Sequence, residues 1–182
     1  GYDQWGIREP NGGGSVTIPY VVIDGELYVG AISQYRPFAG RKITEVSRGF
    51  SLPSETHEET AKREFGEETG AHESLSSRIH PLEGRPVNPN NAFFIANPTK
   101  SEGSRIFGLP INEEEVELIR GSDDPTRRIY RFTPELQGEI KELNERINPA
   151  GIRFFHESLL GKTGEGFTQI AMGKISRAIR NK

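Results

Sequence analysis

The chain has 182 residues, a formal net charge of -3 and no cysteine. This length accommodates one domain with a sizeable core, and the lack of cysteine excludes disulfides, thiolate–zinc sites and cysteine nucleophiles. The acidic balance is untypical of proteins that bind nucleic acid by charge, so we expect no nucleic-acid partner. No apolar run reaches the roughly 20 residues of a transmembrane helix and no signal-peptide pattern opens the chain, so we expect a cytoplasmic protein without a membrane partner.

The first third of the chain predicts strands. Residues 1–14 end in three glycines and are interpreted as an N-terminal arm, followed by one domain over 15–182. Apolar runs flank Asp24-Gly25. This pattern predicts a β-hairpin, because a two-residue type I′ turn needs positive φ at both central positions. A further strand is predicted from Lys42 to Val46.

The next element is predicted to be a helix from Thr56 to Thr69. Thr56 and Glu59 have the spacing of a capping box, and Gly70 fits the residue that ends a helix in the left-handed conformation. Both ends of this helix are therefore marked by the sequence itself.

Four further elements are predicted beyond that helix. Residues Ala92 to Ala96 favour a strand, and the segment "INEEEVELIRG" favours a strand or a short helix. Thr133 and Pro134 fit the start of an amphipathic helix whose apolar stripe is Leu136, Ile140, Leu143 and Ile147. A last helix is predicted over about Gly166 to Arg180. Strands that interleave with helices indicate an α+β or mixed α/β fold.

Three glutamates crowd one face of the first predicted helix. Glu64, Glu67 and Glu68 are spaced three and four apart, where like charges repel, and two of them lie near the negative end of the helix dipole. A glutamate-rich helix is often only a solvated surface. The crowding is also what a hard divalent cation stabilises, and Mg²⁺ binds one or two carboxylates while bridging to substrate phosphates.

The same stretch resembles the Nudix box, whose pattern is G-x5-E-x7-R-E-U-x-E-E-x-G-U with U an apolar residue. The fixed positions are matched over 23 residues by Gly49, Glu55, Arg63, Glu64, Glu67, Glu68 and Gly70. Phe65 and Ala71 occupy the two apolar positions, where the family more often has Ile, Leu or Val. The resemblance implies the Nudix α/β/α sandwich with a mixed sheet and a short N-terminal strand extension.

The resemblance also implies roles for the box residues. Glu64 and Glu68 would be the main ligands of Mg²⁺, with Mn²⁺ as the alternative, and Glu67 would be a further ligand or the base. Arg63 would pair with Glu55 and hold the preceding loop, and the carbonyl of Arg48 would reach the metal. An ordinary surface ion pair is the alternative for Arg63.

The segment before the box is similar to the ADP-ribose and nucleoside diphosphate sugar pyrophosphatase branch. That branch has a Q-Y-R run, here ending at Tyr35 and Arg36, and an acidic residue shortly before the box glycine, here Glu45. The resemblance implies that Arg36 contacts substrate phosphates, that Glu45 lies near the sugar, and that Tyr35 stacks on the base or packs in the core. The branch commonly has Pro-Ala-Gly where this chain has Ser47-Arg48-Gly49.

The branch often carries its base outside the box. The acidic run at Glu113, Glu114 and Glu115 occupies the corresponding place, with Glu114 favoured and a solvated turn as the alternative. The implied activity is metal-dependent hydrolysis of ADP-ribose or a nucleoside diphosphate sugar by a homodimer. The alternatives are a Nudix hydrolase of a dinucleoside polyphosphate, a nucleoside triphosphate or an RNA 5′ end, and a non-catalytic nucleotide sensor.

Overall fold

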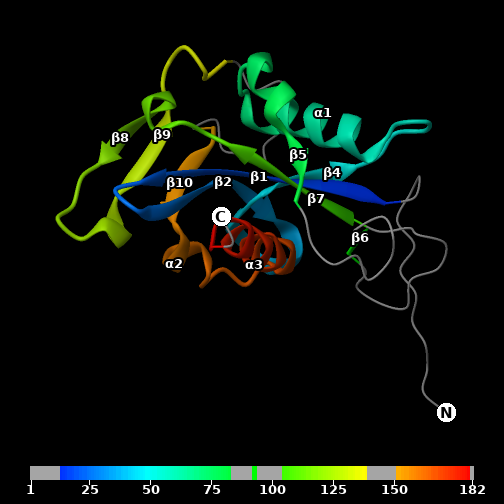
Figure 1. The fold of residues 1–182 in the computed structure, drawn as a ribbon. Coiled ribbons are helices and arrows are strands. Elements are labelled where there is room, and N and C mark those ends of the chain that lie inside the picture. The colour runs from blue at the N-terminus through cyan, green and yellow to red at the C-terminus, as the bar shows by residue number, and fades with distance from the viewer. Residues whose placement is uncertain (1–12, 83–91, 94–103, 139–150, 181–182) are drawn as a thin grey trace.

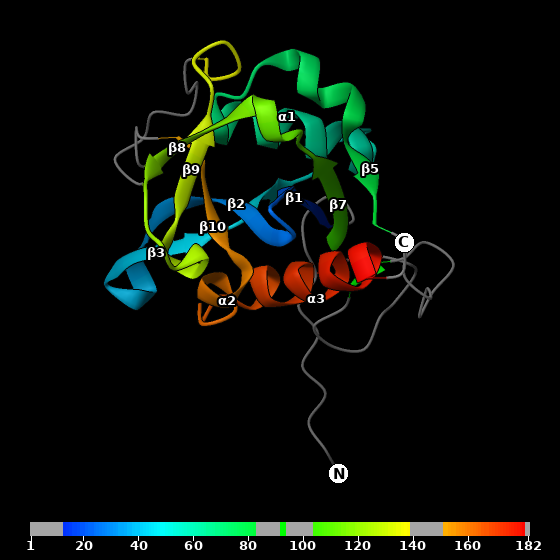
Figure 2. The same cartoon turned by 60° about the vertical axis from the view of Figure 1, so that its left-hand side comes forward.

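The structure is a computed structural model that describes residues 13–82, 92–93, 104–138 and 151–180. It has three layers, with a central sheet between helices (Figure 1). Helix α1 (His57–Thr69) covers one face, and α2 (Glu157–Leu160) and α3 (Gly166–Arg180) cover the other, as the rotated view in Figure 2 also shows. The mixed α/β sandwich expected from the sequence is therefore confirmed. No helix in the described ranges is long and apolar enough to span a membrane.

The sheet joins ten strands among the described residues. Its main path runs through β5 (His80–Pro81), β7 (Ser104–Pro110), β1 (Gly14–Ile23), β2 (Glu26–Arg36), β10 (Arg153–His156), β9 (Ile129–Phe132) and β8 (Val116–Arg120). Three further strands pair beside this path: β3 (Arg41–Glu45) with β2, β4 (Ser47–Phe50) with β1, and β6 (Ala92–Phe93) with β7. Strands β1 and β7 run parallel, while the other pairs are antiparallel. Strand β1 therefore contacts segments from widely separated parts of the sequence.

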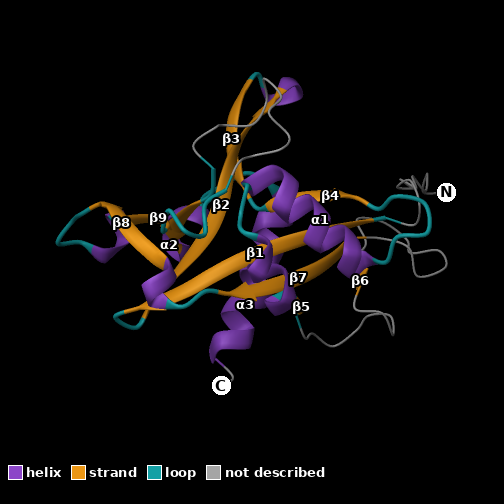
Figure 3. Cartoon of the chain, turned by 90° about the horizontal axis from the view of Figure 1, so that it is seen from above, coloured by secondary structure: helices purple, strands orange, loops and turns teal. Residues whose placement is uncertain are grey.

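The predicted hairpin is confirmed at Asp24 and Gly25, whose φ angles are 54° and 82°. The register pairs Ile23 with Glu26 across this turn. The strand predicted from Lys42 is also confirmed, as β3, which pairs only with the outer half of β2. These two strands form a ribbon that projects from the body of the sheet (Figure 3).

Alternating side chains on the central strands build two cores. Along β1, Val21 contributes to the core under α1, whereas Val16 contributes to the core over α3. Phe65 from α1 and Ile175 from α3 are 2% and 0% exposed, so each helix buries an apolar stripe against its own face of the sheet. The period-2 alternation of a strand thus holds both helical layers on one sheet.

Helix α1 has the ends that the sequence marks. The Thr56 hydroxyl accepts a hydrogen bond from the Glu59 amide at 3.2 Å, and the Glu59 carboxylate accepts one from the Thr56 amide at 2.7 Å. Gly70 ends the helix at φ 64°. The cap holds the helix in a defined register on β4, and this register sets where the box glutamates point.

Replacing Thr56 with alanine is expected to lower the free energy of unfolding by about 1 kcal/mol, because the Glu59 amide at the helix start loses its acceptor, the Thr56 hydroxyl. The serine variant retains the hydroxyl and should behave like the wild type. Urea unfolding of both variants at pH 7 measures the difference. Equal stability of the alanine and serine variants would contradict the capping role.

The helix predicted to start at Thr133 is wrong over its described part. The amides of Leu136 and Gln137 both bond to the Thr133 carbonyl, which forms a turn. Gln137 forms a bridge with Ala71, and the Gly138 amide bonds to the Gly70 carbonyl at 2.7 Å. Pairing with the end of α1 overrides the local helix signal. The stripe residues Ile140, Leu143 and Ile147 lie outside the described residues.

The remaining predictions have mixed outcomes. The last helix is confirmed as α3, over Gly166–Arg180. The acidic segment contains both predicted elements, a 3₁₀ turn at Glu113–Glu115 followed by strand β8. The strand predicted from Ala92 is described only at Ala92–Phe93, and residues 1–12 of the expected arm lie outside the described residues. Strand β1 already begins at Gly14.

Candidate active site

Gly49 on β4 allows a close contact between the strand and α1. A Cβ atom at this position would lie 1.8 Å from Cδ of Glu64 and 2.1 Å from both of its carboxylate oxygens. Any larger residue would therefore overlap the carboxylate. The glycine leaves the space in which Glu64 rests directly against the β4 backbone.

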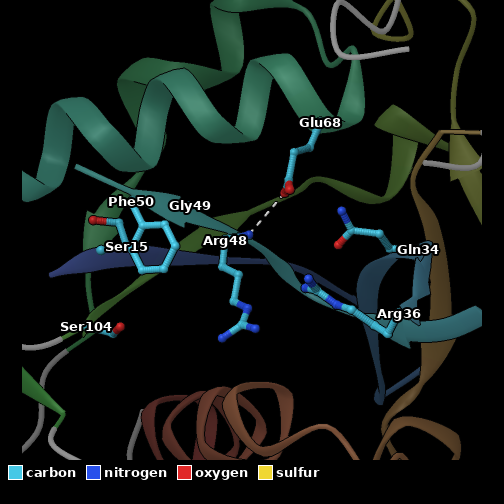
Figure 4. Close-up of a pocket in the computed structure, with 9 residues that line it drawn as sticks. Ser15, Gln34, Arg36, Arg48, Gly49, Phe50, Glu68 and Ser104 are labelled. Atoms are coloured by element: carbon cyan, nitrogen blue, oxygen red, sulfur yellow. Dashed lines mark hydrogen bonds between the residues drawn. The ribbon is translucent and has the colours of Figure 1, made fainter. Parts of the chain in front are cut away.

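Glu68 is the buried carboxylate of the site. It is only 5% exposed, and its Oε2 accepts a hydrogen bond from the Arg48 amide at 3.1 Å (Figure 4). Burial raises the pKa of Glu68 to about 7, and the nearby charges of Glu64 and Glu45 act in the same direction. The Arg48 amide opposes this rise. A carboxylate with this pKa is held in an unfavourable environment that positive charge would relieve.

Arg63 links the loop before α1 to the glutamates on the helix. Its Nε and Nη2 donate to the two carboxylate oxygens of Glu55 at 2.8 and 3.0 Å, and Nη2 also donates to the Phe50 carbonyl at 2.9 Å. Its Nη1 donates to Glu64 at 2.7 Å and to Glu67 at 3.0 Å. The structure thus brings Arg63 and Glu55 together, and one guanidinium orients three carboxylates.

The hydrogen bonds from Arg63 lower the pKa of Glu55 to about 2, and its side chain is only 13% exposed. A carboxyl whose folded pKa lies below its unfolded value stabilises the protein above about pH 4.5, and this contribution is lost as the pH falls toward 2. We expect Arg63→Gln to reduce the free energy of unfolding by about 1–3 kcal/mol at pH 7, with the difference shrinking as the pH falls from 5 to 2.

Urea titrations from pH 7 down to the acid limit of folding test this expectation. Arg131→Gln is the matched control, since Arg131 pairs with Glu117 at 2.6 Å while 54% of its side chain is exposed, and it should change stability by less than about 0.5 kcal/mol. A difference between the wild type and the Arg63 variant that does not depend on pH would contradict the role of Glu55.

The carboxylates of the box fit a divalent cation that is shared with a phosphorylated substrate. Within the described residues, no group of three or more acidic or histidine side chains forms a closed cage, and Arg63 Nη1 lies between Glu64 and Glu67. Mg²⁺ does not need such a cage, because one or two carboxylates plus waters and phosphate oxygens complete its shell. Glu64 and Glu68, close enough for the charge of Glu64 to raise the pKa of Glu68, are the two carboxylates that could hold such a cation.

A pocket of about 140 Å³ opens beside Glu68 (Figure 4). It lies where β1, β2, β4, β7 and α1 meet. Its wall is formed by Gly14, Ser15, Gln34, Arg36, Arg48, Gly49, Phe50, Glu68 and Ser104. Two arginines and one carboxylate line the pocket, so its wall carries more positive than negative side chains, which favours an anionic group.

Arg36 lines the pocket, while Glu45 lies behind it. Arg36 Nε donates to Glu45 Oε2 at 3.1 Å, and its Nη2 contacts the other oxygen of the same carboxylate. Glu45 is fully buried, and burial raises its pKa against the opposing effect of Arg36. The structure therefore gives Glu45 the position of a partner for Arg36 and does not place it on the pocket wall.

The structure does not bring Tyr35 or Glu114 to the pocket. Tyr35 is 39% exposed, and strand alternation turns it away from the face that carries its neighbours in the pocket wall. Glu114 is exposed in the turn after β7. The β1–β7 register pairs Ser15 with Arg105 at the pocket but Tyr20 with Pro110 at the other end, so Glu114 follows the strand end far from the pocket.

Several pocket residues were not predicted from the sequence. Gln34 had a usable signal, because the alternation of strand β2 puts it on the same face as Arg36. Ser15 and Ser104 had none, since they meet only through the parallel pairing of β1 with β7. Phe50 follows the box glycine at a position that the box pattern leaves unspecified.

No family model and no curated protein matches the sequence. Solved structures do match in fold. A candidate Nudix hydrolase from Listeria monocytogenes has a TM-score of 0.56 at 15% identity, with 92% of this chain and 94% of that chain covered. A MutT/Nudix family protein from Listeria innocua has a TM-score of 0.52 at 19% identity, with 96% and 97% covered. An ADP compounds hydrolase has a TM-score of 0.51 at 14% identity, with 97% and 77% covered. The chain therefore has the fold of the Nudix hydrolases.

Proposed function

We propose that this protein hydrolyses the pyrophosphate bond of ADP-ribose or a nucleoside diphosphate sugar, giving a nucleoside monophosphate and a sugar phosphate. The observation that carries the proposal is the position of Glu68, a buried carboxylate of α1 with a raised pKa, in the wall of a pocket that Arg36 also lines. One of the structures that share the fold is an ADP compounds hydrolase, which agrees with this substrate class.

In this proposal Glu64 and Glu68 hold Mg²⁺, or Mn²⁺ as the alternative, with the Arg48 carbonyl beside them. A bound divalent cation supplies positive charge at the scissile pyrophosphate and makes water a stronger nucleophile. Arg63 orients Glu64 and Glu67 through its two hydrogen bonds. The pocket is smaller than the roughly 300–1,000 Å³ of sites that enclose a whole ligand, so we assign it to the diphosphate and the group next to it.

The proposed base is Glu67, which is 31% exposed and stands on the same helix as the metal ligands. Water attacks one phosphorus, the bond from that phosphorus to the bridging oxygen breaks, and the proton of the water passes to Glu67. Glu114 is not used, because it lies at the other end of β7 from the pocket. A homodimer completes the proposal, and this part rests on the resemblance alone.

The test is a substrate panel run with Mg²⁺ and with EDTA, with the products separated by chromatography. The panel contains ADP-ribose, several nucleoside diphosphate sugars, ATP, diadenosine tetraphosphate and a capped RNA. We expect cleavage confined to the diphosphate sugars and ADP-ribose, lost with EDTA. If the protein cleaves only another member of the panel, the class of that compound would replace the proposed substrate class. Metal binding without any cleavage would favour the non-catalytic sensor.

A further inference from the structure

The side chain of Arg48 leaves β4 on the side opposite to α1. Its backbone amide donates to Glu68, but its guanidinium extends toward α3, as Figure 4 shows. There Cζ lies 4.3 Å from the centre of the Phe167 ring. Such a contact between a cation and an aromatic face holds the long side chain in one direction. The amide and the guanidinium of Arg48 therefore serve different parts of the pocket.

Arg48 differs from the other arginine in the pocket wall in how its charge is balanced. Arg36 forms a two-pronged ion pair with the buried carboxylate of Glu45. In the parts of the chain that the structure describes, no carboxylate lies within ion-pair distance of Arg48, and its close neighbour is the uncharged Phe167 ring. Glu45 acts on Arg48 only at longer range, so the charge of Arg48 is less fully balanced than that of Arg36 and can attract an anionic group that enters the pocket.

The scissile pyrophosphate does not require this charge. In the proposed function the metal held by Glu64 and Glu68 neutralises that group, and these carboxylates lie on the α1 side of β4. The Arg48 guanidinium lies on the α3 side, beside Phe167. An anion bound there would be a different part of the substrate from the bond that is cleaved.

We infer that Arg48 is a specificity-determining residue that binds an additional anionic group of the substrate, a phosphate or a carboxylate, beyond the scissile pyrophosphate. The inference rests on the proposed function and narrows its substrate class to nucleoside diphosphate compounds with a further negative charge. Phe167 presents the guanidinium in a fixed direction, so less side-chain entropy is lost when the anion binds.

Matched substrate pairs test the inference. UDP-glucuronic acid differs from UDP-glucose by one carboxylate, and 2′-phospho-ADP-ribose differs from ADP-ribose by one phosphate, so the two pairs distinguish the sources of the charge. For at least one pair we expect the wild type to prefer the charged member in kcat/KM. Arg48→Gln should reduce that preference about tenfold, which is the effect of losing one charge-assisted hydrogen bond. The loss should appear mainly in KM and should be larger for the charged member of each pair than for the uncharged member.

The substitution leaves the backbone amide that serves Glu68 in place. Arg48→Lys keeps the charge and should restore part of the preference, while Lys42→Gln removes an exposed cation that does not line this pocket and should leave the preference intact. If Arg48→Gln leaves the ratio of kcat/KM between the charged and the uncharged member unchanged, the inference is overturned. Equal losses for both members of each pair would also overturn it, because the residue would then act on a group that they share.

Binding measured by calorimetry with Ca²⁺ in place of Mg²⁺ separates this inference from the proposed function. If the wild type cleaves no substrate but binds the charged member more tightly, and Arg48→Gln removes that difference, the proposed hydrolysis fails while the anion site stands. If cleavage occurs without any preference for a charged member, the inference fails while the proposed hydrolysis stands.

Discussion

Replacing Glu68 with glutamine is expected to abolish hydrolysis and, in the metal-free protein, to raise stability. The side chain is 5% exposed and its pKa is raised to about 7. In its proposed role as a metal ligand it would act on the transition state, so activity should fall by about a thousandfold or more. Because the carboxylate is buried, it destabilises the folded protein whenever it is ionised and no cation is bound beside it.

The direction in which the free energy of unfolding changes with pH follows from the raised pKa of Glu68. Between about pH 4.5 and 7 the folded protein holds a proton on Glu68 that the unfolded chain has released, so the free energy of unfolding falls as the pH rises through this window. Glutamine stays neutral at every pH. The variant should therefore match the wild type near pH 4.5 and exceed it by about 1–3 kcal/mol at pH 8.

Urea unfolding in EDTA at several pH values between 4.5 and 8 measures this difference, and the substrate panel measures the activity. Glu58→Gln is the control on the same helix, since Glu58 is exposed and pairs with Lys62 at the surface. It should keep both activity and stability within about 0.5 kcal/mol of the wild type. A Glu68→Gln variant that is less stable than the wild type at pH 8 would refute the account of a destabilising buried charge.

The parts of the fold that could be predicted are those with local causes. The turn at Asp24 and Gly25 needs two positive φ angles, and the capping box at Thr56 satisfies its own amide donors, so neither depends on distant segments. The helix start expected at Thr133 has the same kind of local signal. It fails because Gly70 and Ala71, more than sixty residues earlier, offer that segment a pairing edge.

The candidate site likewise has one part with local causes and another part that depends on distant segments. The spacing of Glu64 and Glu68 on one helix follows from helical geometry, and the contact with Gly49 follows from the loop that joins β4 to α1. The pocket wall is different, because Ser15 and Ser104 meet only in the parallel pairing of β1 with β7. No pattern within either segment specifies that pairing.

The two faces of a strand explain why consecutive residues of a family motif need not line the same pocket. The Q-Y-R run marks three consecutive residues, but only Gln34 and Arg36 share the face that lines the pocket, and Tyr35 turns away. Glu45 shows a related effect. Its position before the box was read as a contact with the sugar, whereas its carboxylate is buried against Arg36 and acts on the pocket through that arginine.

Replacing Gly49 with alanine is expected to reduce activity much more than it reduces stability. The added methyl group would lie 1.8 Å from Cδ of Glu64, so the carboxylate must move away from the β4 backbone. Because the displaced atoms are the end of a flexible side chain, we expect a stability loss below about 2 kcal/mol. If Glu64 has its proposed role as a metal ligand, activity should fall by about a hundredfold or more, since a ligand displaced by an ångström no longer fits the coordination that Mg²⁺ demands.

Gly66→Ala is the matched control, because this glycine lies inside α1, the helix that carries Glu64, and a Cβ there meets nothing within 4 Å. It should keep full activity and raise the free energy of unfolding by up to about 1 kcal/mol, as alanine favours the helix. A cycle with Glu64→Gln then tests the mechanism. If the methyl group acts only by moving Glu64, the double variant should be about as active as either single variant. Multiplying losses would show that the added methyl group also disturbs the site in a way that does not depend on Glu64.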